Sequence, residues 1–119
     1  MRTRRARVVA TAAASALGLG VFAASGVGAT NLKLSTVGAC CKFNVKTLTA
    51  KAGTVTITLT NKSGTTPHNV AIKGKKKGLV VTGGKTSKVT ATLKKGTYVF
   101  YCSVAGHEAA GMKGTLKVT

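Results

Sequence analysis

The amino-acid sequence predicts an all-β protein, a β-sandwich or a small barrel of seven or eight short strands. Three observations support this fold class. After residue 30, apolar and polar residues alternate with a period of two, which is typical of strands with one buried and one solvated face. Turn signals that contain Gly or Asn separate the alternating runs, and no stretch there carries the apolar stripe of an amphipathic helix. The length of 119 residues is enough for one modest domain.

The strands are expected in a regular order along the chain. The clearest run is 54–60, in which valine, isoleucine and leucine point to one side and four threonines point to the other. Further strands are expected at 32–34, 43–48, 70–72, 89–93, 98–101 and 116–118. Turn signals lie at 51–53, 61–64, 83–85 and 94–96. The segment 74–78, which reads GKKKG, is expected to be a charged, solvated loop.

The first 29 residues predict a secretory signal peptide. All four arginines lie within residues 1–7, an apolar stretch rich in Ala and Gly follows, and small residues close it at 27–29. We therefore expect cleavage near Ala29, export to the periplasm, the cell envelope or the extracellular space, and one domain at 30–119. A retained membrane anchor is the alternative, because the apolar run approaches the length of a membrane span. The arginines leave both Sec and twin-arginine export open.

The charge of the chain is strongly one-sided. Lys and Arg number 19 against one acidic residue, Glu108, so the formal net charge is +18. A single carboxylate excludes the paired carboxylates of glycosidases and of two-metal phosphoryl transfer. Beyond residue 29 the charge is still about +14, but no Arg and few aromatic residues remain, so no specific nucleic-acid binding is expected. The charge favours an acidic protein partner or an anionic envelope surface, or it serves solubility alone.

The rarest residue types beyond residue 29 fall into metal-ligand spacing. Residues 102 to 112 read CSVAGHEAAGM, so four residues separate Cys102 from His107 and four separate His107 from Met112. This loop joins two predicted strands, and His68 begins another strand much earlier in the chain. Two imidazoles and a thiolate in a trigonal plane, with a weak axial Met, suit copper that alternates between its two oxidation states. The alternative is a set of ordinary core and surface side chains, and the joint spacing favours the metal site.

The chain resembles the plastocyanin/azurin family of small blue copper proteins, the cupredoxins, from about Leu32 to its C-terminus. Three motifs carry the resemblance: FNVKTLTAKAGTVTITLTN, PHNVAIKG and GTYVFYCSVAGHEAAGMKGTLKV. The gap between Cys102 and His107 is similar to that of azurin, whereas the ending AGMKG is similar to that of plastocyanin.

The resemblance implies a Greek-key β-sandwich that holds one type 1 copper ion near one end, under loops. The four implied copper ligands are His68, Cys102, His107 and Met112. Asn69 is implied to brace the ligand loop through hydrogen bonds. The family often has Pro two residues before the loop histidine, where this chain has Ala105, so every ligand is present but a less rigid loop is expected.

The expected function is that of a one-electron carrier and not of an enzyme, because four protein ligands leave no coordination position for a substrate. Its expected partners are acidic redox proteins in weak, transient complexes, and the chain is expected to be a monomer. The alternative function is copper binding, delivery or storage without a role in a redox chain, for which several exposed Met or His residues would be typical. Zinc is the rival metal for a Cys-His-His set, and the Met ligand argues for copper.

Cys40 and Cys41 have no place in this ligand set. A secreted protein can carry disulfides, so the adjacent pair can form a vicinal disulfide, bridge to another chain or stay as free thiols. The sequence VGAC at 37–40 also faintly resembles a lipoprotein cleavage site, which leaves lipidation of Cys40 open.

Overall fold

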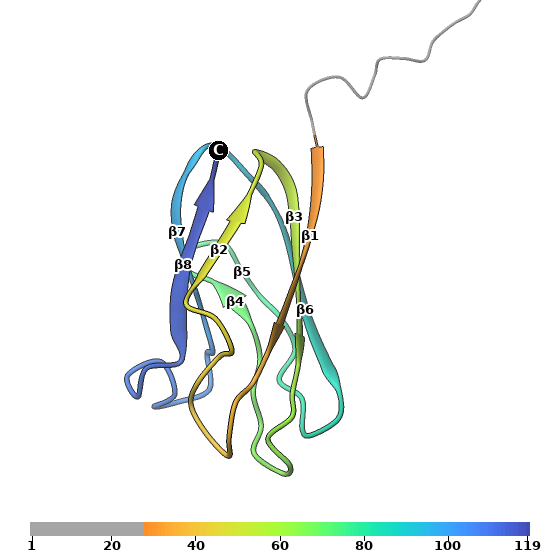
Figure 1. The fold of residues 1–119 in the computed structure, drawn as a ribbon, viewed down its shortest axis with the longest axis vertical. Helices are drawn as coiled ribbons and strands as arrows, with labels where there is room; N and C mark the ends of the chain where they lie inside the picture. The colour runs from red at the N-terminus through yellow and green to blue at the C-terminus, as the bar shows by residue number, and fades with distance from the viewer. Residues whose placement is uncertain (1–27) are drawn as a thin grey trace, which may run out of the picture.

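The computed structural model describes residues 28–119, which form eight strands in two sheets packed face to face (Figure 1). This confirms the all-β sandwich of seven to eight strands that the sequence predicts. The predicted signal peptide lies almost entirely outside the described residues. Its expected end near Ala29 falls inside the first strand, and the cleavage site stays a prediction. Among residues 28–119, no helix is long and apolar enough to cross a membrane.

The first sheet has three long strands in the order β1-β3-β6. They are β1 (Gly28–Ser35), β3 (Gly53–Thr60) and β6 (Thr86–Leu93). β3 pairs in parallel with β1 and antiparallel with β6. In β3 every second residue is buried, as the alternation of apolar residues and threonines predicts.

The second sheet has five strands in the order β2-β8-β7-β4-β5. They are β2 (Thr47–Ala50), β4 (Ala71–Ile72), β5 (Lys76–Lys77), β7 (Gly96–Tyr101) and β8 (Lys113–Val118). β2 pairs in parallel with β8, and the remaining pairs are antiparallel. The chain passes from one sheet to the other between β1 and β2, β2 and β3, β3 and β4, β5 and β6, and β6 and β7, so neighbours in a sheet are often distant in sequence.

This topology collects four connections at one end of the sandwich. Because successive strands run in opposite directions, the links β1–β2, β3–β4, β5–β6 and β7–β8 all lie at the end opposite the C-terminus (Figure 1). The first of them carries Cys40 and Cys41, the second carries His68, and the fourth carries His107. Side chains that are far apart in the sequence therefore meet at this end.

The core between the sheets is apolar and closely packed. Val55, Ile57 and Leu59 from β3 and Phe100 from β7 are fully buried. The ring of Phe43, from the β1–β2 link, lies against Phe100 with 5.5 Å between ring centroids. This close-packed core gives rigid support to the end of the sandwich at which His68 and His107 lie.

Two strand predictions are wrong. The segment 74–78 is not only a loop, because Lys76 and Lys77 form β5 at the sheet edge, paired with β4. Both lysines are exposed, so no alternation of apolar residues marks this strand. The run 43–48 is extended only from Thr47. Phe43 makes an isolated bridge to Thr36, and its apolar character reflects packing against the core and not a continuous strand.

Candidate metal centre

His68 is positioned by hydrogen bonds of its backbone and by a buried polar network. Its backbone N–H donates to the carbonyl of Val81 at 3.0 Å, and its carbonyl accepts from Val81 N–H at 2.9 Å. Earlier in the same link, the side-chain amide of the fully buried Asn61 donates to the carbonyls of Thr66 (2.9 Å) and Val81 (2.7 Å). These bonds tie the β3–β4 link to the β5–β6 link, so the fully buried imidazole of His68 has a fixed backbone.

The other three predicted residues lie on the β7–β8 link. Cys102 directly follows β7, is fully buried and carries a free thiol. Its N–H donates to the carbonyl of Met112 at 3.1 Å, and Met112 N–H donates to the carbonyl of His107 at 3.0 Å. Gly106 and Gly111 have positive φ angles of 84° and 112°, which permit the tight turns on either side of His107. The link is therefore a compact loop with Met112 fully buried and His107 partly exposed.

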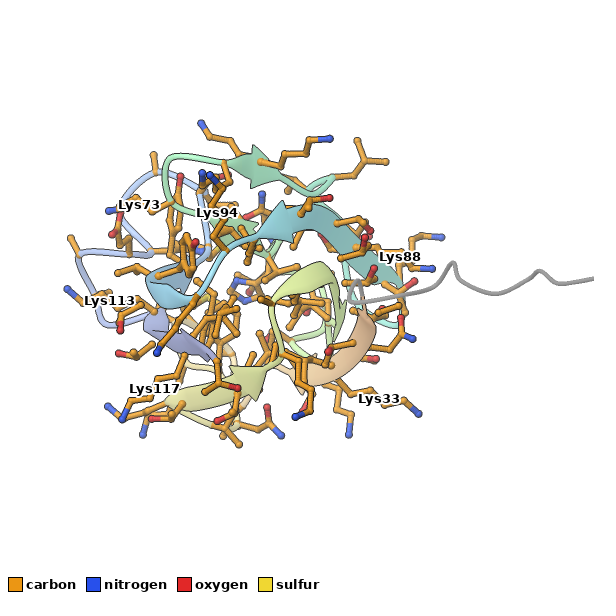
Figure 2. The ribbon with its side chains drawn as sticks, turned by 90° about the horizontal axis from the view of Figure 1, so that it is seen from above. Lys33, Lys73, Lys88, Lys94, Lys113 and Lys117 are labelled. Carbon is orange, nitrogen blue, oxygen red and sulfur yellow. A yellow bond between two sulfur atoms is a disulfide. The ribbon has the colours of Figure 1, made fainter. Side chains whose placement is uncertain are left out.

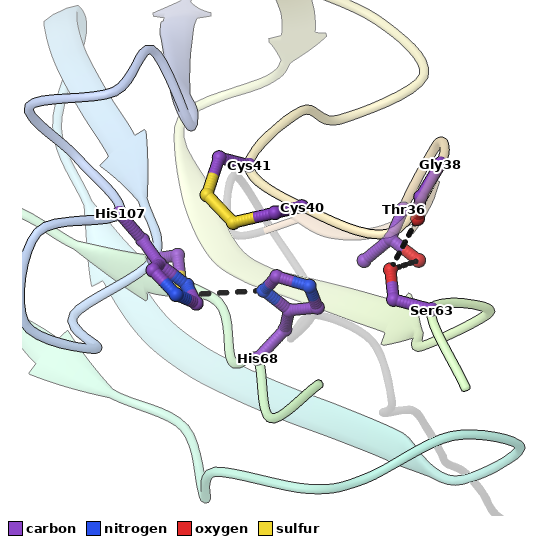
Figure 3. Close-up of a disulfide and its surroundings, with 8 residues drawn as sticks. Thr36, Gly38, Cys40, Cys41, Ser63, His68 and His107 are labelled. Atoms are coloured by element: carbon purple, nitrogen blue, oxygen red, sulfur yellow. Dashed lines mark hydrogen bonds between the residues drawn. A yellow bond between two sulfur atoms is a disulfide. The ribbon is translucent and has the colours of Figure 1, made fainter. Parts of the chain in front are cut away.

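Three potential ligand atoms converge at this end of the sandwich. The Sγ atom of Cys102 lies 3.9 Å from Nδ1 of His68 and 3.5 Å from Nδ1 of His107. The imidazole rings of His68 and His107 have centroids 4.9 Å apart and an interplanar angle of 51°, and they lie side by side in Figure 3. The donor atoms of these three residues all lie within 4.8 Å of one another. The structure therefore brings together three of the four predicted ligands, His68, Cys102 and His107.

The separations fit one metal ion at the centre of the three donors. Metal–thiolate and metal–imidazole bonds of about 2.3 Å and about 2.0 Å, spread by about 120°, place sulfur and nitrogen about 3.7 Å apart. The two observed sulfur–nitrogen distances, 3.5 Å and 3.9 Å, lie on either side of this value. Two imidazoles, a thiolate and a nearby Met are the donor set of type 1 copper. The donor types and the two sulfur–nitrogen distances therefore fit such an ion.

The ring of His68 is kept in its neutral, metal-binding form. Burial, and after it the neighbouring His107, lowers the pKa of His68 from its ordinary value of 6.5, and the backbone of Ala39 opposes this effect. Among residues 28–119, Nε2 of His68 is the buried side-chain polar atom that has no hydrogen-bond partner. In the neutral tautomer that carries its proton on Nε2, the lone pair of Nδ1 is free to bind a metal on the side of Cys102.

Asn69 joins the two ligand-bearing links. Its side-chain N–H groups donate to the carbonyl of Gly78 (2.9 Å) and to the hydroxyl oxygen of Ser103 (2.8 Å). Its Oδ1 accepts from the backbone N–H of Ser103 at 2.7 Å. Because Asn69 follows His68 and Ser103 follows Cys102, these bonds fix the two predicted ligands relative to each other.

Sequence reasoning missed three features of this end. Glu108, next to His107, forms an ion pair with Lys73, whose ammonium lies 4.8 Å from the ring centroid of Tyr101. Asn61 organises the link that carries His68. Cys40 and Cys41 form the vicinal disulfide that the sequence leaves open as one of several states, but its position is new: both sulfur atoms lie within 4.8 Å of a ring nitrogen of His107 (Figure 3). No short-range pattern signals these contacts, because each one depends on how the links meet in space.

Solved structures with the same architecture are known. An auracyanin from Roseiflexus castenholzii is 25% identical, with a TM-score of 0.64 and coverage of 79% of this chain and 99% of that chain. Auracyanin A, a blue copper protein from Chloroflexus aurantiacus, is 24% identical with a TM-score of 0.67 and coverage of 77% and 100%. Amicyanin from Paracoccus versutus is 23% identical with a TM-score of 0.57 and coverage of 80% and 83%. No curated protein matches the chain in sequence.

The eight-stranded sandwich and the His-Cys-His cluster under its end loops define the cupredoxin class of architecture. A family model described as a cupredoxin-like domain matches residues 11–118. The chain therefore belongs to the cupredoxin-like domain family.

Proposed function

We propose that this chain is a type 1 copper protein that carries single electrons between redox proteins. In this proposal His68, Cys102 and His107 are the trigonal ligands of one copper ion, and Met112 is the weak axial ligand. The observation that carries the proposal is the position of the buried Cys102 thiol, 3.5 Å and 3.9 Å from two imidazole nitrogens. When bound there, copper supplies reversible one-electron chemistry between its cupric and cuprous states.

The protein contributes a fixed, dry ligand set. His68, Cys102 and Met112 are fully buried, and the hydrogen bonds of Asn69 hold the two ligand-bearing links together. Soft sulfur favours the cuprous state and imidazole suits the cupric state, so a fixed compromise limits the rearrangement during electron transfer. Four protein ligands would leave no position for a substrate, which supports a carrier over an enzyme.

His107 is the proposed edge for electron exchange. It is the partly exposed member of the set, and its loop neighbours Ala105, Gly106, Ala109 and Ala110 are exposed and small. Small side chains let a partner approach the imidazole closely. A contact of this kind is modest in area, as is typical of transient redox complexes.

The proposed partners are acidic redox proteins, and the proposed location is outside the cytoplasm. The first proposal is supported by the net charge of about +14 that remains beyond residue 29, which favours encounter with an anionic surface. The second is supported by the signal-peptide pattern at 1–29. The chain is proposed to act as a monomer.

Copper delivery is the alternative function, and one experiment separates it from electron carriage. Copper-loaded protein is cycled electrochemically in the presence of a cuprous chelator. A carrier gives a reversible one-electron couple and keeps its copper through repeated cycles, because all ligands stay in place in both states. Release of the ion to the chelator after each reduction would favour delivery and would contradict the proposed role.

A further inference from the structure

A second group of metal-binding side chains lies at the mouth of the buried cluster. The donor atoms of Cys40, Cys41 and His107 all lie within 4.8 Å of one another. Cys40 is exposed, and Cys41 and His107 are partly buried, so this group is open to solvent. Figure 3 shows the two sulfur atoms next to the imidazoles of His68 and His107. The proposed electron carrier makes no use of Cys40 or Cys41.

The loop that carries the two cysteines is positioned by contacts other than the disulfide. The N–H of Val37 donates to the carbonyl of Lys42 at 3.0 Å and closes the loop. The buried hydroxyl of Ser63 donates to the carbonyl of Gly38 at 2.8 Å and lies 2.9 Å from the hydroxyl of Thr36. None of these bonds involves the disulfide, so the loop has anchors that do not depend on the sulfur–sulfur bond.

The backbone of Cys41 also marks this loop as unusual. Its φ angle is +95°, in a region that residues other than glycine rarely adopt. Such conformations persist where the surrounding structure holds them, and they cluster at ligand-binding and switch sites. The hydrogen bonds of Val37 with Lys42 and of Ser63 with Gly38 flank this residue on both sides.

We propose that Cys40 and Cys41, in their reduced form, make a second metal site with His107 that takes a cuprous ion. A thiol reductant breaks the sulfur–sulfur bond: two electrons and two protons pass from a dithiol to the pair, and the dithiol becomes a disulfide. Two thiolates and an imidazole are a soft donor set, which favours monovalent copper, and binding displaces the two thiol protons. The disulfide form offers no thiolate, so the site exists in one redox state of the pair.

The proposed site of Cys40, Cys41 and His107, here called the outer site, contains neither His68 nor Cys102. It can therefore be tested apart from the inner site of His68, Cys102 and His107. The two sites share His107, which places a cuprous ion at the outer site one ligand exchange away from the inner cluster. The Cys102→Ala variant isolates the outer site. Alanine suits this position because a buried free Cys packs as a small apolar group.

The test compares the oxidised and reduced forms of the Cys102→Ala chain. The reduced form is prepared with a phosphine reductant, which is then removed, and the oxidised form is prepared without it. Each form is titrated with cuprous ion under anaerobic conditions, in competition with a chromophoric cuprous chelator. The reduced form is expected to bind one cuprous ion more than about a hundredfold more tightly than the oxidised form, because two linked thiolates act together. The two forms share one sequence, and circular dichroism checks that both are folded.

Two further variants complete the test. In the same background, Cys40→Ser with Cys41→Ser is expected to remove the effect of reduction, and His107→Ala is expected to weaken binding by the reduced form. Equal affinities of the oxidised and reduced forms would overturn the proposal, and an affinity indifferent to His107→Ala would overturn the role of His107. The proposed electron carrier is tested separately in the unmutated disulfide form, where the outer thiolates are absent.

Discussion

At the scale of single residues, the four predicted ligands differ in how deeply they are buried. The side chains of His68, Cys102 and Met112 are fully buried, whereas His107 is partly exposed. In the proposed function, burial protects the thiolate and the thioether from solvent and oxidants, and the partly exposed imidazole of His107 provides an electronic connection to the surface. The division follows from the fold, because the loop folds back so that Cys102 and Met112 face the core.

The axial ligand gives the first prediction. Met112→Leu should keep the protein blue and raise its reduction potential by tens of millivolts, where about 59 mV corresponds to a tenfold change in a one-electron equilibrium. The reason is that loss of a weak sulfur donor disfavours the cupric state. Cyclic voltammetry of the copper-loaded variant measures the shift. A lower potential, or complete loss of copper, would show that Met112 is not a weak axial ligand.

The buried His68 gives a prediction about pH. Because its pKa is lowered from 6.5, the folded chain binds fewer protons at this ring than the unfolded chain does just below pH 6.5. The stability contributed is therefore fully present above about pH 6.5 and is lost as the pH falls toward the folded pKa. Urea unfolding of the metal-free chain at about pH 7.5 and about pH 5.5 should show this decrease.

The matched control is His68→Gln, which cannot titrate. Its free energy of unfolding should change less between the two pH values than that of the unmutated chain. An equal decrease in both chains would assign the pH dependence to other groups and would contradict the effect of His68.

The predicted ligands could be found from the sequence because three of them share one short loop. Their spacing from Cys102 to Met112 is local, and His68 is one of two histidines in the chain. The partners of these residues could not be found in this way. The hydrogen bonds of Asn61, the ion pair of Glu108 and the position of the cysteine pair join segments that only the sandwich brings together.

At the scale of elements, β3 provides the main support of the core. Its apolar residues are fully buried, and its threonines are partly exposed on the other side. Leu59→Ala should lower the free energy of unfolding by about 2–5 kcal/mol through lost burial and the cavity left behind. Thr58→Ala, one position away on the outer face, should change it by no more than about 0.5 kcal/mol. Urea denaturation of the metal-free variants measures both, and equal losses would contradict the assignment of the two faces.

Strands with a clear alternation of apolar and polar residues were predictable, and β5 was not. β3 and β6 alternate over eight residues each, which gives a strong period of two. β5 consists of two exposed lysines at a sheet edge, and its pairing with β4 depends on backbone bonds that leave no apolar pattern. Phe43 illustrates the opposite error. This buried aromatic residue lies in a link, but its apolar side chain leads to the prediction that a strand begins there.

At the scale of the whole molecule, the dominant property is positive charge spread over all sides. Viewed along the sandwich, the labelled lysines lie on several different sides of it (Figure 2). With one carboxylate in the chain, this arrangement creates a broad positive field and not a single charged patch. The ion pair of Lys73 with Glu108 connects the β4–β5 hairpin, which carries the lysines at 75–77, to the loop that carries His107.

Ionic strength tests whether this field guides a partner. Electron transfer to an acidic redox protein should slow as salt rises, because exposed charges are screened within about 10 Å at about 0.1 M salt. Changing Lys75, Lys76 and Lys77 to Gln should flatten this dependence, measured by stopped-flow spectroscopy. The same charge change at Lys51, Lys94 and Lys95, in turns at the opposite end, should flatten it less. Rates indifferent to salt would leave solubility as the role of the charge.

The central claim is that Cys102 provides the thiolate of a type 1 copper site, and the visible spectrum of the cupric protein tests it most directly. The unmutated chain should turn blue through thiolate-to-copper charge transfer, and so should the chain with Cys40→Ser and Cys41→Ser. Cys102→Ser should be colourless, although it keeps both histidines. A blue Cys102→Ser chain, or loss of the colour in the Cys40→Ser, Cys41→Ser chain, would contradict the assignment.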